Sequence, residues 1–359
     1  MAAIAFRAMI ALPPIYFYLP PSQWPSDWPQ SPSENWPGFG LGIYAWTLQT
    51  YLHLAAAGVP CQLVDQIPEA GIVFAHSNSF RVTRPRPRLG QSLLLVCLKA
   101  EEPAYAHGQL HVVQNRAEAN GHNRIFLPHW PQPGLIKRDP QRGDRFETVA
   151  FLGHRDSLAP ELEQPEWQNF VESLNLHWQP VVNVNHWSDY GSLDARWHDY
   201  RHLDAIIAVR SFNRRYLKQQ QLYRYKPPTK LYNAWLAGVP AILGQESAFR
   251  SERQHPLDYL EVSSLNELKA ALVNLKADVN LRRQMSAQGH QRAEAIAPEQ
   301  ITVRWIAFLQ SVALPAYDRW CAQPRWRQSL RLQRSVGETL VEKAQRRLRS
   351  RGVVLGGAG

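Results

Sequence analysis

Short apolar runs separated by polar or turn-forming segments recur along the first third of the chain. Five of them have the length of a buried strand, at residues 15–19, 62–64, 71–75, 92–98 and 111–114. Such runs are typical of a mostly parallel sheet that is covered on both faces. Between the first two runs, residues 43–57 carry apolar side chains on most faces and end at Gly58, which predicts a helix with a glycine cap.

Two proline-rich segments interrupt this pattern. Residues 13–37 hold eight prolines and three tryptophans and lead into Gly38, Gly40 and Gly42. That density of proline excludes a helix or a central strand, so we expect a long loop before the first helix. Residues 126–134 hold three prolines and predict a connection between domains. The apolar run at residues 2–19 favours a first strand over a signal peptide, because Pro13 and Pro14 interrupt it and no cleavage site is clear.

The second half repeats the alternation of strands and helices. Strands are predicted at 148–152, 181–184, 205–209 and 239–244, and helices at 165–176 and 229–237. The pattern predicts an α/β protein with two doubly wound, Rossmann-like domains that face one another across a cleft. We expect an N-terminal domain at 1–130, a linker at 131–147, a second domain at 148–315 and a basic helical tail at 316–359. Ligands of such sheets bind at the carboxyl ends of the strands.

Composition narrows the class of protein. The chain has 359 residues, of which 45% are hydrophobic, and a mean hydropathy of −0.38, without an apolar run long enough to span a bilayer. A soluble globular protein is therefore expected. Three widely spaced cysteines fit neither a disulfide framework nor a zinc site and favour the reducing cytoplasm. The chain has no Asp-x-Asp pair and no His/Cys cluster with ligand spacing, so we expect no metal and no other cofactor.

The net charge of +10 is concentrated at the C-terminus. Residues 319–359 hold ten basic and two acidic residues, which accounts for +8 and leaves the body near neutral. Within 326–348, apolar residues recur at mostly helical spacing among arginines, namely Leu330, Val336, Leu340, Ala344 and Leu348. This pattern predicts a basic amphipathic helix that binds an anionic membrane surface, on the inner face of the plasma membrane. The alternative is a helix that packs its apolar stripe on its own domain, and Gly337 argues against one long helix.

A second basic cluster follows the strand at 71–75. It consists of Arg81, Arg84, Arg86 and Arg88, interleaved with Pro85 and Pro87. We interpret it either as a contact for a lipid-linked phosphate or phospholipid, or as a solvated loop.

Residues 226–242, Lys-Pro-Pro-Thr-Lys-Leu-Tyr-Asn-Ala-Trp-Leu-Ala-Gly-Val-Pro-Ala-Ile, resemble the donor-site signature of GT-B glycosyltransferases of the group 1, family-4-like type. A helix N-terminus there offers free N–H groups and a partial positive charge to a diphosphate. The resemblance implies a GT-B architecture and a hexosyl or related transferase that uses a nucleotide-sugar and a saccharide or lipid-linked acceptor. It places Lys226 and Lys230 at the basic positions before that helix, and Arg210 at a second diphosphate-binding position.

One departure from the signature bears on mechanism. Many retaining members carry two glutamates eight residues apart, whereas the corresponding residues here are Tyr225 and Asn233. Asn233 can hydrogen-bond a ribose hydroxyl, but neither residue supplies a carboxylate. The segment 230–244 also resembles inverting fucosyltransferases, in which an asparagine is normal, so inversion is slightly favoured.

An inverting transferase needs a general base. His76, after the strand at 71–75, is the first candidate, and Glu101 the second, with Glu102, His107 and Glu34 behind them. The alternative role of His76 is that of a capping or core-edge histidine. Glu246 and Ser247 follow the strand that ends at Leu243 and are expected to contact the donor. Trp197-His198-Asp199-Tyr200 could line the nucleotide pocket or pack at a strand entry, and the loop of Gly38, Gly40 and Gly42 could approach a phosphate or the acceptor.

Two alternatives to an active transferase remain. The missing glutamates fit a catalytically inactive protein of the same fold that binds a sugar or nucleotide. The basic tail would fit a nucleic-acid-binding protein, but the near-neutral body argues against a nucleic-acid partner.

Overall fold

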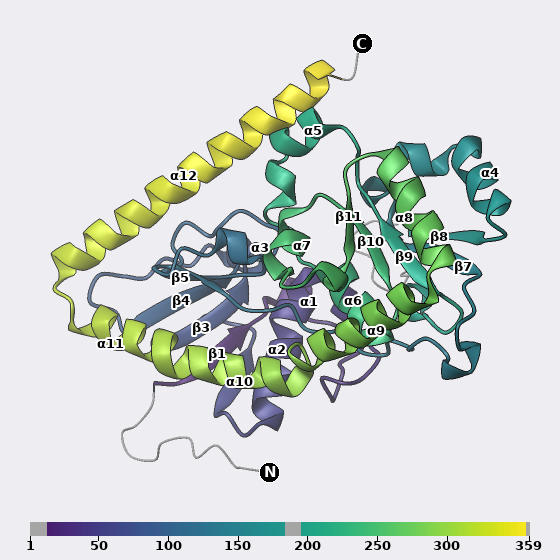
Figure 1. Cartoon of the computed structure of the whole chain (residues 1–359). Coiled ribbons are helices and arrows are strands. Elements are labelled where there is room, and N and C mark those ends of the chain that lie inside the picture. The colour runs from purple at the N-terminus through teal and green to yellow at the C-terminus, as the bar shows by residue number, and fades with distance from the viewer. Residues whose placement is uncertain (1–12, 184–194, 357–359) are drawn as a thin grey trace.

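Two parallel sheets, each flanked by helices, make up the protein (Figure 1). The structure is a computed structural model that describes residues 13–183 and 195–356. Residues 2–12 of the apolar N-terminal run and Val184 of a predicted strand lie outside the described residues. The predicted fold class, α/β with two doubly wound Rossmann-like units, is confirmed by the two sheets.

The first sheet has the strand order β2-β1-β3-β4-β5-β6, and all its pairs are parallel. Its strands are β1 (Ile15–Tyr18), β2 (Cys61–Val64), β3 (Gly71–His76), β4 (Leu93–Leu98), β5 (Leu110–Val113) and β6 (Arg124–Phe126). Every residue of β3, β4 and β5 is buried. This two-sided burial explains why these strands are uninterrupted apolar runs in the sequence. The strand β6 was not predicted.

The prediction of one continuous helix at 43–57 is wrong. The segment is divided into α1 (Gly42–Trp46) and α2 (Leu48–Ala56) at Thr47. The Thr47 hydroxyl accepts a hydrogen bond of 3.3 Å from the His76 backbone N–H, which ties the break to the end of β3. The helix α3 (Ser77–Thr83), which follows β3 directly, was not predicted either.

The second sheet has the order β11-β10-β9-β7-β8 and is also parallel. Its strands are β7 (Thr148–His154), β8 (His177–Asn183), β9 (Ala205–Ala208), β10 (Ala241–Gly244) and β11 (Leu260–Val262). Its helices are α4 (Pro165–Ser173), α5 (Arg214–Gln219), α6 (Thr229–Ala237), α7 (Ser247–Glu252), α8 (Leu265–Ala277) and α9 (Val279–Glu294). The bounds of α6 are those predicted, and the helix ends at Gly238 in the left-handed conformation, with φ 74°.

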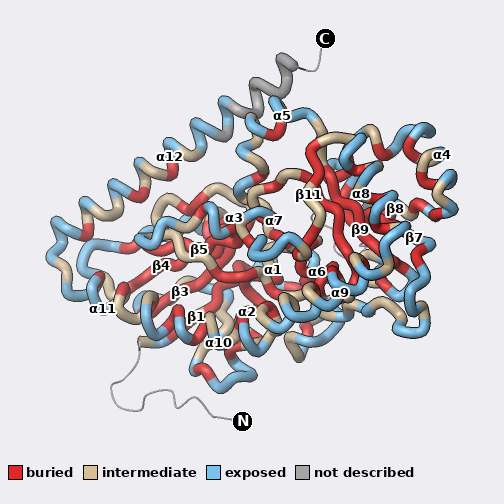
Figure 2. Tube along the Cα trace, in the orientation of Figure 1, coloured by how far each residue is buried: buried red, intermediate tan, exposed pale blue. Residues whose placement is uncertain are grey.

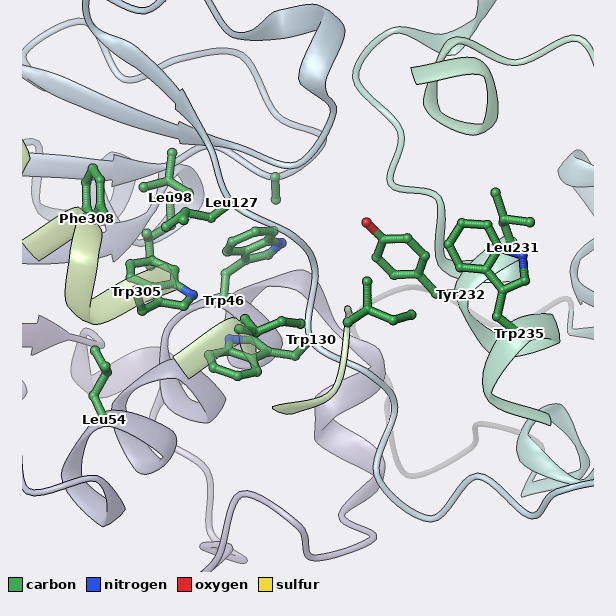
Figure 3. Packing of buried hydrophobic residues seen from close by; sticks show 14 of the residues in the cluster. Trp46, Leu54, Leu98, Leu127, Trp130, Leu231, Tyr232, Trp235, Trp305 and Phe308 are labelled. Atoms are coloured by element: carbon green, nitrogen blue, oxygen red, sulfur yellow. The ribbon is translucent and has the colours of Figure 1, made fainter. Parts of the chain in front are cut away.

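The chain returns to the first sheet through α10 (Pro298–Phe308), the π-helical turn η11 (Leu309–Ala313) and α11 (Leu314–Ala322). Trp305 of α10 packs edge-on against Phe74 of β3, with ring centroids 6.1 Å apart, and lies 6.4 Å from Trp46 of α1. Figure 3 shows Trp46, Trp130 and Trp305 in one group, and Leu231, Tyr232 and Trp235 of α6 in another.

The proline-rich loop before α1 packs around Trp36, which is buried. A Cβ added to Gly38 would lie 2.1 Å from the Trp36 ring, so glycine is needed there for packing. Trp24 and Trp28 stack on one another, with centroids 5.1 Å apart. Trp24 and Trp28 thus contact one another, whereas Trp36 packs on Phe39 and on Tyr44 of α1.

The basic tail forms one helix, α12 (Arg325–Gly356), which continues through Gly337 against expectation. Figure 1 shows it running from α11 toward α5, and it contacts α5. Its residues are mostly exposed or half-buried, whereas the central strands of both sheets are buried (Figure 2). Within the described residues, no helix has the length and apolar character needed to cross a membrane.

Candidate functional site

The carboxyl ends of the two sheets face one another across the junction of the two units. Asn115, after β5, donates from Nδ2 to the Ser247 hydroxyl at the start of α7, at 3.3 Å. Gln114 donates from Nε2 to the Tyr225 carbonyl at 3.0 Å. Arg116 pairs with Glu252 of α7, with 3.2 Å between Nε and Oε1. This is the edge at which open parallel sheets bind ligands, so the candidate site is sought here.

Arg210 lies just past the end of β9 and is held on three sides. Its Nε donates to Glu246 Oε1 at 3.0 Å, its Nη1 donates to the Ser157 hydroxyl, and its guanidinium lies 4.9 Å from the centre of the Tyr223 ring. The other Glu246 oxygen, Oε2, is buried and has no hydrogen-bond partner among the described residues. Both residues were predicted to contact the donor, and the structure brings them together.

Lys230 lies in the first turn of α6, beside this pair. Pro228 at the N-cap provides no side-chain hydrogen bond to the free N–H groups of the helix. The Lys230 ammonium lies 5.5 Å from the centre of the Phe151 ring, and within the described chain the structure records no hydrogen bond or ion pair for it. A Cβ at Gly153, in β7, would lie 2.9 Å from the ammonium nitrogen, so glycine makes room for the lysine.

The electrostatics of Lys230 indicate an incompletely neutralised cluster. Although part of the residue is accessible, protein atoms surround its ammonium group. Burial, and then the positive charges of Arg210 and Lys226, lower the Lys230 pKa to about 7. An anion placed among these cations would relieve their mutual repulsion. The site can therefore hold a phosphate-bearing ligand at a helix N-terminus.

Lys226 and Glu101, predicted for different roles, form one ion pair across the two units. Glu101 follows β4 of the first sheet, and Lys226 lies on the loop that precedes α6. The Glu101 side chain is 41% exposed. The carboxylate therefore lies at the same cleft as the cation cluster and remains accessible from solvent.

His76 is buried at the end of β3, where it caps α3. Its Nδ1 accepts a hydrogen bond of 3.2 Å from the Asn78 backbone N–H, so the neutral ring carries its proton on Nε2. Burial lowers the His76 pKa to about 4, which keeps the ring neutral near pH 7. Nε2 faces Gly42, where an added Cβ would lie 3.6 Å away. In this state His76 presents a donor at Nε2 and no lone pair to take up a proton.

Other predicted residues have their own neighbours. Asn233, one turn along α6, lies near the buried Tyr200 hydroxyl. Ser247 contacts Asn115, as described above. Gly40 is exposed, whereas Gly42 is half-buried at the start of α1 against His76. Trp197 packs edge-on against His154 at the end of β7, with centroids 5.0 Å apart.

The lower-ranked base candidates have structural partners. Glu102 pairs with Arg81 at 3.0 Å. His107 packs against Tyr105, with ring centroids 5.7 Å apart, and Glu34 accepts the Gln30 backbone N–H at 2.9 Å within the proline-rich loop.

Ser157, Tyr223 and Asn115 contribute to the site and were missed in the sequence. Ser157 and Asn115 follow the carboxyl ends of β7 and β5, so the rule that singled out Arg210 and Glu246 applied to them equally. Tyr223 lies on a turn in which Gln221, Leu222 and Tyr223 all have positive φ. No local sequence pattern predicts that conformation.

No family model matches the sequence, and no curated protein matches it. Among solved structures, HepE from Anabaena, in complex with UDP and glucose, is similar with a TM-score of 0.46 and 11% identity, over 84% of this chain and 100% of HepE. TarM of S. aureus is similar with a TM-score of 0.45 and 7% identity over 73% of this chain, which spans 58% of TarM. Sucrose-phosphate synthase from Thermosynechococcus elongatus has a TM-score of 0.43 and 12% identity, over 75% of this chain and 77% of the synthase. These likenesses concern the general course of the chain and carry no statement about substrate or mechanism.

Proposed function

We propose that the protein is a glycosyltransferase of the GT-B type that transfers a sugar, a hexose or a related one, from a nucleotide-sugar donor to a saccharide or lipid-linked acceptor. The observation that carries this proposal is the cluster of Arg210, Lys230 and the uncapped N-terminus of α6 at the junction of the two sheets. The similar HepE structure holds UDP and glucose, which fits the proposal without supporting it independently.

In this proposal the donor diphosphate lies over the start of α6. Lys230 gains an ion pair that it lacks in the described structure, and Arg210 contributes a second cation whose orientation Glu246 and Ser157 fix. The nucleoside would extend along the second sheet toward His154, at the end of β7, and Trp197, which packs against it. Cations and helix N–H groups suffice to stabilise a leaving diphosphate, so we propose that the reaction needs no metal ion. Within the described residues, no three His, Cys, Asp or Glu side chains are grouped as metal ligands.

The transfer step requires a base at the first sheet, and Glu101 is the better placed of the two candidates. When the diphosphate attracts Lys226, the Glu101 carboxylate is released to take the proton of the acceptor hydroxyl. The acceptor oxygen then forms a bond to the anomeric carbon, and the bond from that carbon to the diphosphate oxygen breaks. Attack from the opposite side inverts the configuration. His76 would donate from Nε2 to a substrate oxygen near Gly42.

A thermal-shift and calorimetric screen tests the donor site. UDP, GDP, dTDP, ADP and CMP, with their sugars, are tested against the wild-type protein, Lys230→Ala and Arg210→Lys. Lys269→Ala is the matched control, because Lys269 also lies over a phenylalanine ring but on α8, away from the cleft. We expect one nucleotide to raise the melting temperature of the wild type and of Lys269→Ala and to have a much smaller effect on the two site variants.

The proposal fails if no nucleotide stabilises the wild type at millimolar concentration, or if Lys230→Ala and Lys269→Ala respond equally. Arg210→Lys keeps the positive charge next to Glu246, so its loss of binding would not reflect an unpaired buried carboxylate.

A catalytically inactive nucleotide-binding protein is the second candidate. It is favoured by the ion pair that engages Glu101 and by the protonated Nε2 of His76. Nucleotide binding without transfer to any acceptor and without hydrolysis of the donor would decide for it.

A further inference from the structure

The tail helix α12 is amphipathic in an unusual sense, because its polar face is the one turned toward the protein. Gln328, Ser335 and Thr339 are buried. Gln328 accepts the Gly90 backbone N–H at 2.7 Å, and the Ser335 hydroxyl donates to the Gly108 carbonyl at 3.0 Å. These hydrogen bonds, together with the half-buried Leu332 that packs against the core, attach the helix to the first domain.

Leu332 and Val336 of α12 are half-buried, whereas most of its other apolar residues lie on the side away from the protein and are exposed. Trp326 is 60%, Leu330 57%, Leu340 60% and Leu348 71% exposed, and Val341 is exposed as well. At 100° per residue these positions, with Gly337 and Ala344, fall on one side of the helix, and their mean direction is about 180° from that of the buried polar residues. We call this surface, made of Trp326, Leu330, Gly337, Leu340, Val341, Ala344 and Leu348, the outer face. It extends for about 33 Å along the helix axis.

The charges of α12 are sorted in the same way. Arg327 and Arg334 flank the outer face on one side, Lys343 and Arg347 flank it on the other, and all four are exposed. The two glutamates are turned toward the first domain. Glu342 pairs with Arg124 at 2.8 Å, and Glu338 accepts from Asn123 Nδ2 at 3.1 Å while it also pairs with Arg334. The outer face is consequently apolar with a basic border, and its acidic residues are directed away from it.

The loop that carries Arg84, Arg86 and Arg88 adjoins the beginning of α12. The hydrogen bond from Gly90 to Gln328 fixes the loop there, and Trp320 donates from Nε1 to the Gln91 carbonyl at 2.9 Å. In this loop Arg84, Arg86, Arg88 and Leu89 are all exposed. The loop adds basic and apolar surface next to the N-terminal end of α12.

We propose that the outer face of α12 lies in the surface of an anionic lipid bilayer, with the apolar side chains among the acyl chains and the flanking cations at the phosphates. An exposed apolar face with a Lys/Arg border is the pattern of interfacial helices. A second copy of the chain fits this face less well, because pairing two outer faces would bring their basic borders together. The proposal does not depend on the reaction proposed above.

Vesicle sedimentation of the full chain tests this proposal. The probes are vesicles of phosphatidylcholine with 40% phosphatidylglycerol, and vesicles of phosphatidylcholine alone, at about 0.1 M salt. The test variant combines Trp326→Ser, Leu330→Ser, Leu340→Ser and Val341→Ser, all at exposed positions. The matched control combines Val273→Ser and Val303→Ser, which are exposed valines of α8 and α10. A gain variant, Gly337→Leu, adds an apolar side chain in the middle of the outer face, where nothing lies within 4 Å.

We expect the wild type and the valine control to bind the anionic vesicles, the four-serine variant to bind at least about tenfold more weakly, and Gly337→Leu to bind severalfold more tightly. Binding to vesicles without phosphatidylglycerol should be at least about tenfold weaker than to the anionic ones. The proposal is overturned if the wild type binds neither vesicle, if binding does not depend on phosphatidylglycerol, or if the serine variant binds as the wild type does. It is also overturned if ultracentrifugation shows a wild-type dimer that the serine substitutions dissociate and that does not bind vesicles. Because no nucleotide is used, none of these results bears on the transferase proposal.

Discussion

At the scale of single residues, the cation cluster combines one held charge with one that lacks a recorded partner. Arg210 is oriented by Glu246, Ser157 and Tyr223, whereas the Lys230 ammonium is surrounded by protein atoms and has no recorded ion pair within the described chain. Burial of the ammonium group makes its protonated form less stable. A bound anion would offset the free-energy cost of the Lys230 charge. Gly153 belongs to the same arrangement, because its missing side chain leaves room for the ammonium group.

This lysine predicts a pH dependence of nucleotide binding. The Lys230 pKa is about 7 in the unliganded protein and would rise next to a diphosphate, so binding takes up a proton above pH 7. We therefore expect the affinity of the preferred nucleoside diphosphate to fall by up to about tenfold per pH unit between pH 7 and 9. Calorimetry at pH 7, 8 and 9, in buffers of different ionisation enthalpy, measures both the affinity and the proton uptake. Lys230→Arg, which stays protonated, should bind with little change over this range, and a wild type without proton uptake would contradict the assignment.

At the scale of elements, the sequence pattern located strands and helices correctly where local features of the segment itself determine the structure. The strands β3 and β4 are buried on both faces, and α6 ends at a glycine whose left-handed conformation marks the stop, so local patterns located all three. The break at Thr47 was missed because it depends on a hydrogen bond to His76, 29 residues away. The pairing of Glu101 with Lys226 depends in the same way on a tertiary contact that no local pattern records. For α12 the helical periodicity was visible, but which of its faces is turned outward depends on partners such as Gly90 and Gly108.

Gly337 gives a prediction for α12 as an element. It lies inside the helix, is exposed, and has no atom within 4 Å of an added Cβ. Gly337→Ala should therefore stabilise the helix by about 1 kcal/mol, because alanine loses less backbone entropy than glycine. Hydrogen exchange of the α12 amides should slow about fivefold.

Gly238→Ala is the contrasting variant. Gly238 has φ 74°, and an added Cβ would lie 2.7 Å from the His290 ring, so this change should destabilise the second domain. If Gly337→Ala leaves exchange in α12 unchanged, the helix does not continue through this position in solution.

At the scale of the whole molecule, helices and side chains cross repeatedly between the two units. The return of α10 and α11 to the first sheet, and the contact of α12 with α5, join the units on the outside. The contacts of Gln114, Asn115 and Arg116 with the second unit join them at the cleft. The outer face of α12 belongs to the helix that contacts both units, so a membrane bound there would hold the whole molecule at the lipid surface. A lipid-linked acceptor would then meet the cleft by diffusion within that surface.

The Lys226–Glu101 ion pair is the cleft contact that a donor would change most directly. In our proposal Lys226 turns to the diphosphate, and Glu101, once released, becomes the base. Glu101→Gln should therefore lower kcat at least about 100-fold, since general base catalysis contributes about that much or more. The same change should leave nucleotide affinity equal or severalfold higher, because it removes a negative charge beside the anion site and frees Lys226. Steady-state kinetics and nucleotide titration on the same samples separate the two effects.

Glu102→Gln, which alters the neighbouring carboxylate that Arg81 holds, is the control and should change kcat only a few fold. A Glu101→Gln protein with unchanged kcat would remove Glu101 as the base, whereas loss of nucleotide binding would mean that the ion pair keeps the cleft in the form that binds the donor.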